Sequence, residues 1–216
     1  YQAELSALGT LKSSLSSFKD AAAKLADSDD LLKVTATSGD EAMFTASASS
    51  SSSSGEYSIE VLNLAKSQKL SSTGFSSSND PVGTGTLTIG SGDNSFGVTI
   101  DGTNNSLAGI RDAINASADN GSVTATIVNV DDGAGGTEAR LVLTSKATGI
   151  ENQISIQVTE DSDDGVLETG LSQLSYGYDA NGVGSGGMNE LVAAEDAQLR
   201  VDGMLATRSS NSISDV

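Results

Sequence analysis

Cysteine and histidine are both absent from this sequence of 216 residues. Without cysteine, neither a disulfide framework nor a thiolate metal site can form. Without histidine, the Ser-His-Asp and Cys-His catalytic pairings are excluded, and the commonest protein ligand of zinc, copper and iron is missing. Most hydrolase chemistry is therefore ruled out before any motif is considered, and the sequence predicts no catalytic residues, no cofactor and no metal site.

Aromatic residues make up only 4% of the chain and hydrophobic residues 37%, and no apolar run approaches the ~20 residues that span a bilayer. A core built from Leu, Val, Ile and Ala is therefore small, although the apolar residues are too well patterned for a disordered chain. These features predict a folded protein with a modest core and many loops.

Basic side chains are also scarce, with 11 Lys and Arg against 29 Asp and Glu, which gives a net charge of -18. Such an acidic surface repels phosphate backbones and anionic lipid headgroups. The charge therefore argues against nucleic-acid binding and against binding to a membrane surface.

The first 33 residues read as an amphipathic helix, "YQAELSALGTLKSSLSSFKDAAAKLADSDDLLK". Apolar residues recur in steps of three and four, which is the pattern of a narrow coiled-coil seam. The seam residues are Leu5, Leu8, Leu11, Leu15, Phe18, Ala22 and Leu25. Nothing later in the sequence offers a helix of matching length, so the expected partner is a further part of the protein or another subunit. The alternative is a helix that packs on its own sheet domain.

The remainder of the chain reads as antiparallel strands. We expect a strand before the serine run Ser49–Ser54 to pair with the strand that starts at Tyr57, with the serines as an exposed loop. Residues 83–188 form the clearest block, with strands at 86–89 and 96–100, a helix capped by Ser106, a hairpin over 122–145 and a further strand. Another hairpin, over 197–210, turns at Asp202-Gly203.

The predicted fold class is α+β, mainly antiparallel β. A leg helix over 1–33 precedes a discontinuous β-rich head domain, 34–82 plus 189–216. A second β-rich head domain with one helix, 83–188, is inserted into it. Serine-rich and glycine-rich polar stretches, about 66–83 and 160–190, bracket this insert.

Three short motifs resemble binding or catalytic motifs, but each lacks a feature that the site needs. Counted from Asp161, "DSDDGVLE" places glycine fifth and glutamate eighth, whereas a calcium-binding EF-hand needs them sixth and twelfth. Gly182, Gly184 and Gly187 form a G-x-G-x-x-G, but no βαβ unit surrounds them. Ser16 and Lys19 have the spacing of serine-lysine acylases, but they lie on the predicted leg helix.

Four stretches together resemble the flagellar filament cap family, hook-associated protein 2 (the FliD family). "YQAELSALGTLKSSLSSFKDAAAKL" is similar to its leg helix, and "GEYSIEVLNLAKSQKLSSTGF", the most specific match, to its strand-plus-tail motif. "SLAGIRDAINASADNGSVTATIVN" with "ARLVLTSKATGIENQISI" resembles a motif shared by flagellins and cap proteins. "AAEDAQLRVDGMLATRSSNSISDV" is similar to the strand that returns to the first head domain.

The resemblance implies a structural, non-enzymatic protein. Cap proteins form a homo-oligomeric plate at the distal tip of the bacterial flagellum, contact flagellin with their leg helices and promote flagellin folding and polymerisation. They are secreted by the flagellar type III route, and some also act as adhesins to host mucin. A flagellin or hook-filament junction protein, or a secreted adhesin or binding module, remains the alternative. The family's terminal arms and the second half of its leg are absent from this sequence.

Overall fold

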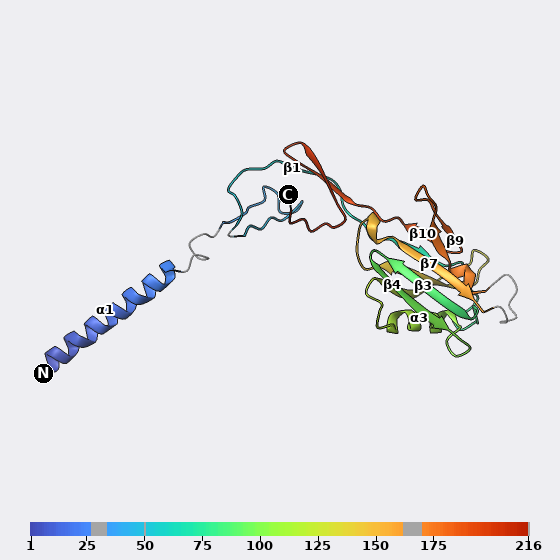
Figure 1. Cartoon of the computed structure of the whole chain (residues 1–216), viewed down its shortest axis with the longest axis horizontal. Coiled ribbons are helices and arrows are strands. Elements are labelled where there is room, and N and C mark those ends of the chain that lie inside the picture. The colour runs from blue at the N-terminus through green and yellow to red at the C-terminus, as the bar shows by residue number, and fades with distance from the viewer. Residues whose placement is uncertain (27–33, 50, 162–169, 216) are drawn as a thin grey trace. The chain divides into compact units, whose positions relative to one another are not determined.

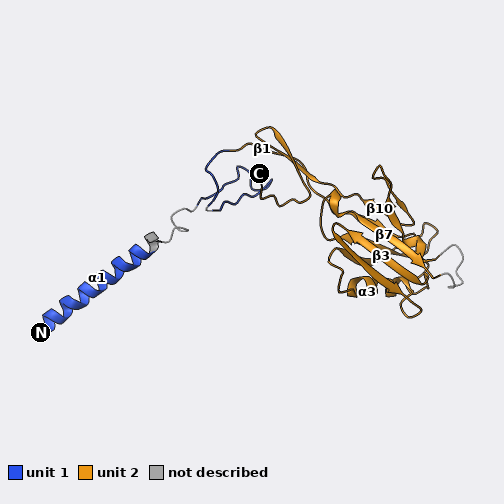
Figure 2. Ribbon diagram, in the orientation of Figure 1, with its two compact units in different colours: residues 1–56 blue, residues 57–216 orange. Residues whose placement is uncertain are grey.

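A computed structural model describes residues 1–26, 34–49, 51–161 and 170–215. The chain divides into two compact units, residues 1–56 and residues 57–216, which Figure 2 colours separately. One helix leads the chain and mainly antiparallel strands follow it. The predicted fold class, α+β with mostly antiparallel sheets, is confirmed.

The first unit contains helix α1, Gln2–Ala26, and an irregular segment over 34–49 (Figure 1). The strand predicted before the serine run does not form in this segment, so that prediction was wrong. The Asp40 carboxylate accepts a hydrogen bond from the Ala42 N–H, and the Asp40 carbonyl accepts from Met43 and Phe44. Aspartate competes in this way with a strand ladder by offering the backbone local partners.

The second unit holds three antiparallel sheets, with strand orders β1-β11-β12, β10-β2-β6-β5 and β4-β3-β7-β8-β9 (Figure 1). The strands of the first sheet are β1 Ile59–Asn63, β11 Ala197–Val201 and β12 Met204–Arg208. Those of the second are β10 Asn189–Val192, β2 Lys69–Ser71, β6 Thr137–Ser145 and β5 Val123–Asp131. Those of the third are β4 Asn94–Ile100, β3 Gly85–Ser91, β7 Ile154–Glu160, β8 Tyr176–Tyr178 and β9 Gly184–Gly186.

The hairpins form at the turns that the sequence predicts. Strands β3 and β4 pair from Ser91↔Asn94 onward, across a two-residue turn whose Gly92 has φ +60°. Strands β11 and β12 turn at Asp202 and Gly203, both with positive φ. Positive φ at both central residues is typical of the type I′ turn, whose twist matches that of the flanking strands.

Helix α3, Leu107–Ala116, packs against β5 and closes the core. Ser106 caps it as predicted, because its Oγ accepts a hydrogen bond from the Gly109 N–H at 3.1 Å. The apolar stripe of α3 is fully buried with side chains from the four-stranded and five-stranded sheets. The largest fully buried side chains are Leu70, Leu87, Ile89, Ile100, Leu107, Ile110, Ile114, Leu141, Leu143, Ile154, Leu171 and Leu174.

The two polar stretches that bracket the predicted insert contain short elements. Strand β2 lies in the first, and the second contains the 3₁₀ turn η2, Leu171–Leu174, with strands β8 and β9. Each of these strands has only three residues, so no period of two is visible in the sequence. They form because the edge of an existing sheet supplies their hydrogen-bond partners.

The flanking segments of the predicted discontinuous domain meet in one sheet. Strand β1 pairs with β11 from Ile59↔Val201 to Asn63↔Gln198. In contrast, β2 and β10, which the predicted boundaries place outside the insert, belong to the sheet of β6 and β5. The boundaries 34–82 plus 189–216 and 83–188 therefore stay a prediction.

Candidate functional site: an apolar helix stripe and the junction of the sheets

The predicted seam of α1 is a row of large apolar side chains that face solvent. Leu5, Leu8, Leu11, Leu15 and Phe18 are each 63% to 75% exposed. Leu25 lies in the last turn of α1, but its side chain falls outside the described residues. Most of the stability of a helix in a protein comes from tertiary packing of its apolar face, and on α1 this face is exposed.

Helix α1 is amphipathic. It carries Lys12, Lys19 and several serines besides its leucines. None of the helices in the described part of the chain is long and apolar enough to cross a membrane.

The second feature is the junction between the three-stranded sheet and the other two sheets, which we define as residues 65–68, 148–150, 194–196 and 209–211. The side-chain amide of Asn211 holds both backbone groups of Ala65, accepting from its N–H at 2.7 Å and donating to its carbonyl at 3.0 Å. Lys66 and Glu195 exchange backbone hydrogen bonds and also form an ion pair at 3.0 Å. Two segments separated by more than 120 residues are thus joined at the end of β1.

The loop before β7 reaches the same junction. The Thr148 Oγ1 donates to the Ser209 carbonyl at 2.7 Å, and the Ile150 N–H donates to the Asp196 carboxylate at 2.8 Å. Gly149 has φ +94°, and a Cβ there would collide with Ser209. The junction is therefore a network of polar contacts with little room for larger side chains.

Gln68, the last residue of the first junction segment, has no exposed surface. Its Oε1 accepts from the Ile154 N–H at 2.6 Å, and its Nε2 donates to the Tyr178 hydroxyl and the Glu190 carboxylate. These three partners lie on β7, β8 and β10, so the side chain of Gln68 connects strands of two sheets. Burial raises the pKa of the Tyr178 phenol to about 12.

The motif "LNLAKSQKL" can now be interpreted residue by residue. Ala65 fits the Asn211 amide, Gln68 connects the sheets, and Leu70 is fully buried in the core. Sequence reading identified this stretch as the most specific family match but gave no role to Gln68. Gln68 stands in the polar run 66–69, so nothing in the sequence distinguishes it from an exposed residue.

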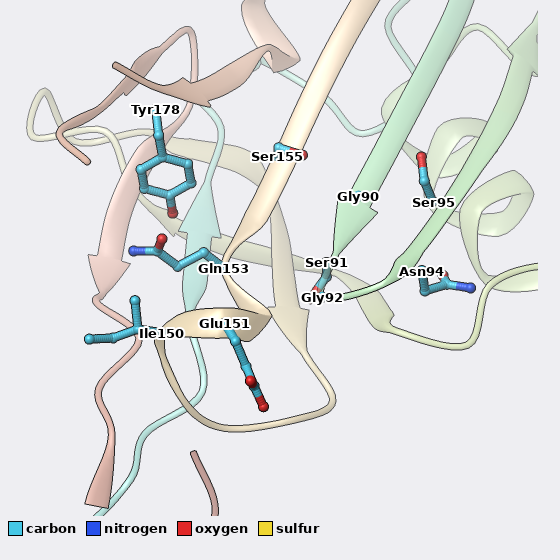
Figure 3. A pocket seen from close by; sticks show the side chains of 10 residues that line it. All are labelled: Gly90, Ser91, Gly92, Asn94, Ser95, Ile150, Glu151, Gln153, Ser155 and Tyr178. Atoms are coloured by element: carbon cyan, nitrogen blue, oxygen red, sulfur yellow. The ribbon is translucent and has the colours of Figure 1, made fainter. Parts of the chain in front are cut away.

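The five-stranded sheet also carries an open hollow of about 380 Å³, shown in Figure 3. Tyr178 and Ile150 lie on one side of it and Asn94 and Ser95 on the other, with β7 between them. Small residues of β3 and β7, such as Gly90 and Ser155, line it. Glu151 is the one acidic residue among those that line it.

Two of the three short motifs lie in the described residues: Ser16 and Lys19 are exposed on α1, and the glycines of the G-x-G-x-x-G lie around strand β9. Gly184 lies where a Cβ would collide with the Tyr176 hydroxyl, and Gly187 lies against the backbone of Gln173, so packing accounts for both glycines. The acidic stretch 162–169 lies outside the described residues. Among the described residues, no group of three acidic side chains is placed to hold a metal ion.

An exposed helical stripe with coiled-coil spacing is typical of proteins that assemble through helix packing. Comparison with known proteins identifies the family. The sequence model described as flagellar hook-associated protein 2 N-terminus matches residues 1–68. The flagellar hook-associated protein 2 of Escherichia coli (strain K12) is 38% identical over 100% of this chain and 44% of its own length. The B-type flagellar hook-associated protein 2 of Pseudomonas aeruginosa is 36% identical over 98% of this chain and 44% of its own length.

Solved structures agree with these sequence matches. The structure of the flagellar cap protein FliD D1-D2-D3 domains from Escherichia coli matches at a TM-score of 0.74 and 36% identity, over 98% of this chain and 56% of that one. FliD from Pseudomonas aeruginosa matches at a TM-score of 0.63 and 34% identity, over 77% and 71%. The chain belongs to the flagellar hook-associated protein 2, or FliD cap protein, family. It spans less than half the length of the curated relatives named here.

Proposed function

We propose that this chain is the part of a flagellar filament cap protein that carries the first leg helix and the head domains. The whole protein self-assembles at the distal tip of the filament, outside the cell, and promotes the folding and polymerisation of flagellin. It is exported by the flagellar type III route and catalyses no covalent chemistry. The family membership carries this proposal.

The exposed stripe of α1 supports an assembly role. Five large apolar side chains at coiled-coil spacing stay in solvent unless another helix covers them. We propose a leg formed by α1 and a helix from the part of the protein beyond this chain, with flagellin contacting the completed leg. Leu5, Leu8, Leu11, Leu15, Phe18 and Leu25 are the proposed seam.

Charge sets a condition on self-assembly. The part of each subunit formed by this chain carries a net charge of -18, so identical copies of this part repel one another at long range. Physiological salt screens such repulsion beyond a Debye length of ~8–10 Å. Assembly through the head domains should therefore strengthen as salt rises, which is the reverse of assembly driven by complementary ion pairs.

The proposal is tested by rescue of motility in a cap-deficient strain. We expect the full-length protein to restore filament growth, and Leu11→Asp with Leu15→Asp to reduce the rescue because charge on the seam blocks helix packing. Ser13→Asp is the matched control, since Ser13 lies about half a helical turn from the seam. Sedimentation of the full-length protein should show larger species at higher salt. A protein that stays monomeric at every salt concentration and fails to restore filaments would overturn the proposal.

A further inference from the structure

Asn-Gly is the dipeptide in which an asparagine side chain is most readily attacked by the following backbone nitrogen, because glycine has no side chain to hinder the approach. The sequence has two such pairs, Asn120-Gly121 and Asn181-Gly182. From the sequence alone the two sites are equivalent. The structure makes them very different.

The backbone N–H of the glycine donates a hydrogen bond at both sites. The Gly121 N–H donates to the Asp119 carbonyl, two residues earlier, and the Gly182 N–H donates to the Asp179 carbonyl, three residues earlier, each at 3.0 Å. Neither attacking nitrogen is therefore free, and the large difference between the sites lies in how the asparagine side chains are held.

The two side-chain amides are held very differently. Asn120 is half-buried, its Nδ2 donates to the Ile114 carbonyl at 2.9 Å, and its Oδ1 accepts from the Val123 N–H at 3.1 Å. It closes the C-terminal turn of α3 and the start of β5. Asn181 is exposed, and its amide has one long contact of 3.5 Å to the Asp179 carboxylate. No group among the described residues donates a hydrogen bond to the Oδ1 of Asn181.

We infer that Asn181 is a site of spontaneous deamidation and isomerisation, and that Asn120 is protected from the same reaction by its two backbone hydrogen bonds. The Gly182 nitrogen, after losing its proton to solvent, attacks Cγ of Asn181. The bond from Cγ to Nδ2 breaks and ammonia leaves, which gives a five-membered succinimide. Water then opens the ring, to aspartate when it attacks Cγ and to isoaspartate when it attacks the main-chain carbonyl.

Either product alters the turn between β8 and β9. Asp179 Oδ1 accepts hydrogen bonds from the N–H groups of Val183 and Asn181, which lower the pKa of the Asp179 carboxyl. A new carboxylate at position 181 stands beside this one and repels it. Isoaspartate also adds a methylene to the main chain, so the hydrogen bond from the Asp179 N–H to the Val183 carbonyl at 3.0 Å loses its register. Strand β9 pairs with β8 over three residues only, so this edge strand should loosen.

Peptide mapping by mass spectrometry tests the inference, and it does not depend on the proposed capping function. The full chain is incubated in mildly alkaline buffer, once folded and once in denaturant, and each Asn-Gly peptide is followed over time. In the folded protein we expect Asn181 to react about tenfold or more faster than Asn120, since Asn120 must first break two hydrogen bonds through local opening. In denaturant the two rates should converge.

Asn181→Gln is the variant control, because its longer side chain would have to close a six-membered ring. It should abolish the modification at this turn and leave the rate at Asn120 unchanged. Equal rates at the two sites in the folded protein would overturn the inference. So would an Asn181 peptide that stays unmodified while the denatured chain reacts.

Discussion

Gln68 offers the sharpest test of how the sheets are held together. Replacing it with alanine removes the acceptor of the Ile154 N–H and the donor to Tyr178 and Glu190. Ile154 is fully buried, so its N–H cannot find water after the change. A buried donor left without a partner costs ~1–3 kcal/mol.

The other two hydrogen bonds contribute less. Glu190 is exposed and Tyr178 half-buried, so water can replace Gln68 for both, and each loss costs roughly 0.5–1 kcal/mol. The free energy of unfolding of the second unit should therefore fall by about 2–5 kcal/mol. For a domain of this size, ~2–4 °C of melting temperature is lost per kcal/mol, so Tm should fall by roughly 4–20 °C.

Thermal and urea unfolding, followed by circular dichroism, measure this change. Gln157→Ala is the matched control, since Gln157 is an exposed glutamine on β7, and it should change stability by less than about 0.5 kcal/mol. Gln68→Met keeps most of the side-chain volume but still leaves the Ile154 N–H without an acceptor. If Gln68→Met were as stable as the natural protein, the void and not the lost hydrogen bonds would explain the alanine variant, and our account of the junction would be wrong.

Three further predictions follow from the same geometry. Leu11→Asp with Leu15→Asp should leave the melting temperature of the second unit within about 1 °C, and a large drop in a differential scanning calorimetry trace would show that the helix packs on the sheets. Asn211→Ala should destabilise the second unit by ~1–3 kcal/mol, because the amide and carbonyl of buried Ala65 both lose their partner; urea unfolding with unchanged stability would contradict this. In an ultraviolet titration, one tyrosine should ionise near pH 12 and disappear in Tyr178→Phe. Because the folded state keeps that proton longer than the unfolded state, stability should fall as pH rises from about 10 to 12.

Local pattern was sufficient for the elements whose stability is local. The apolar residues at steps of three and four from Leu5 to Phe18 predicted α1. Ser106 predicted the start of α3, because its hydroxyl accepts a hydrogen bond from the first turn of that helix. The turn at Asp202-Gly203 gave the β11–β12 hairpin, since positive φ favours those residues whatever surrounds them. The end of α3 is marked less directly: the helix stops at Ala116, four residues before the Asn120-Gly121 pair, and the Asn120 side chain donates to the Ile114 carbonyl.

The sequence by itself determined the class of fold, the exposed seam and the family, because periodicity, turn chemistry and motif are properties of neighbouring residues. Tertiary structure alone decided what distant residues do to one another. It buried Gln68 between two sheets, paired β1 with β11, and gave β8 and β9 an edge to join. It also placed the two Asn-Gly pairs differently, since the Asn120 side chain is hydrogen-bonded to the backbone and the Asn181 side chain is exposed. For Gln68 and for the pairing of β1 with β11, the deciding partners lie far along the chain, and a hydrogen bond to such a group leaves no pattern in the local sequence.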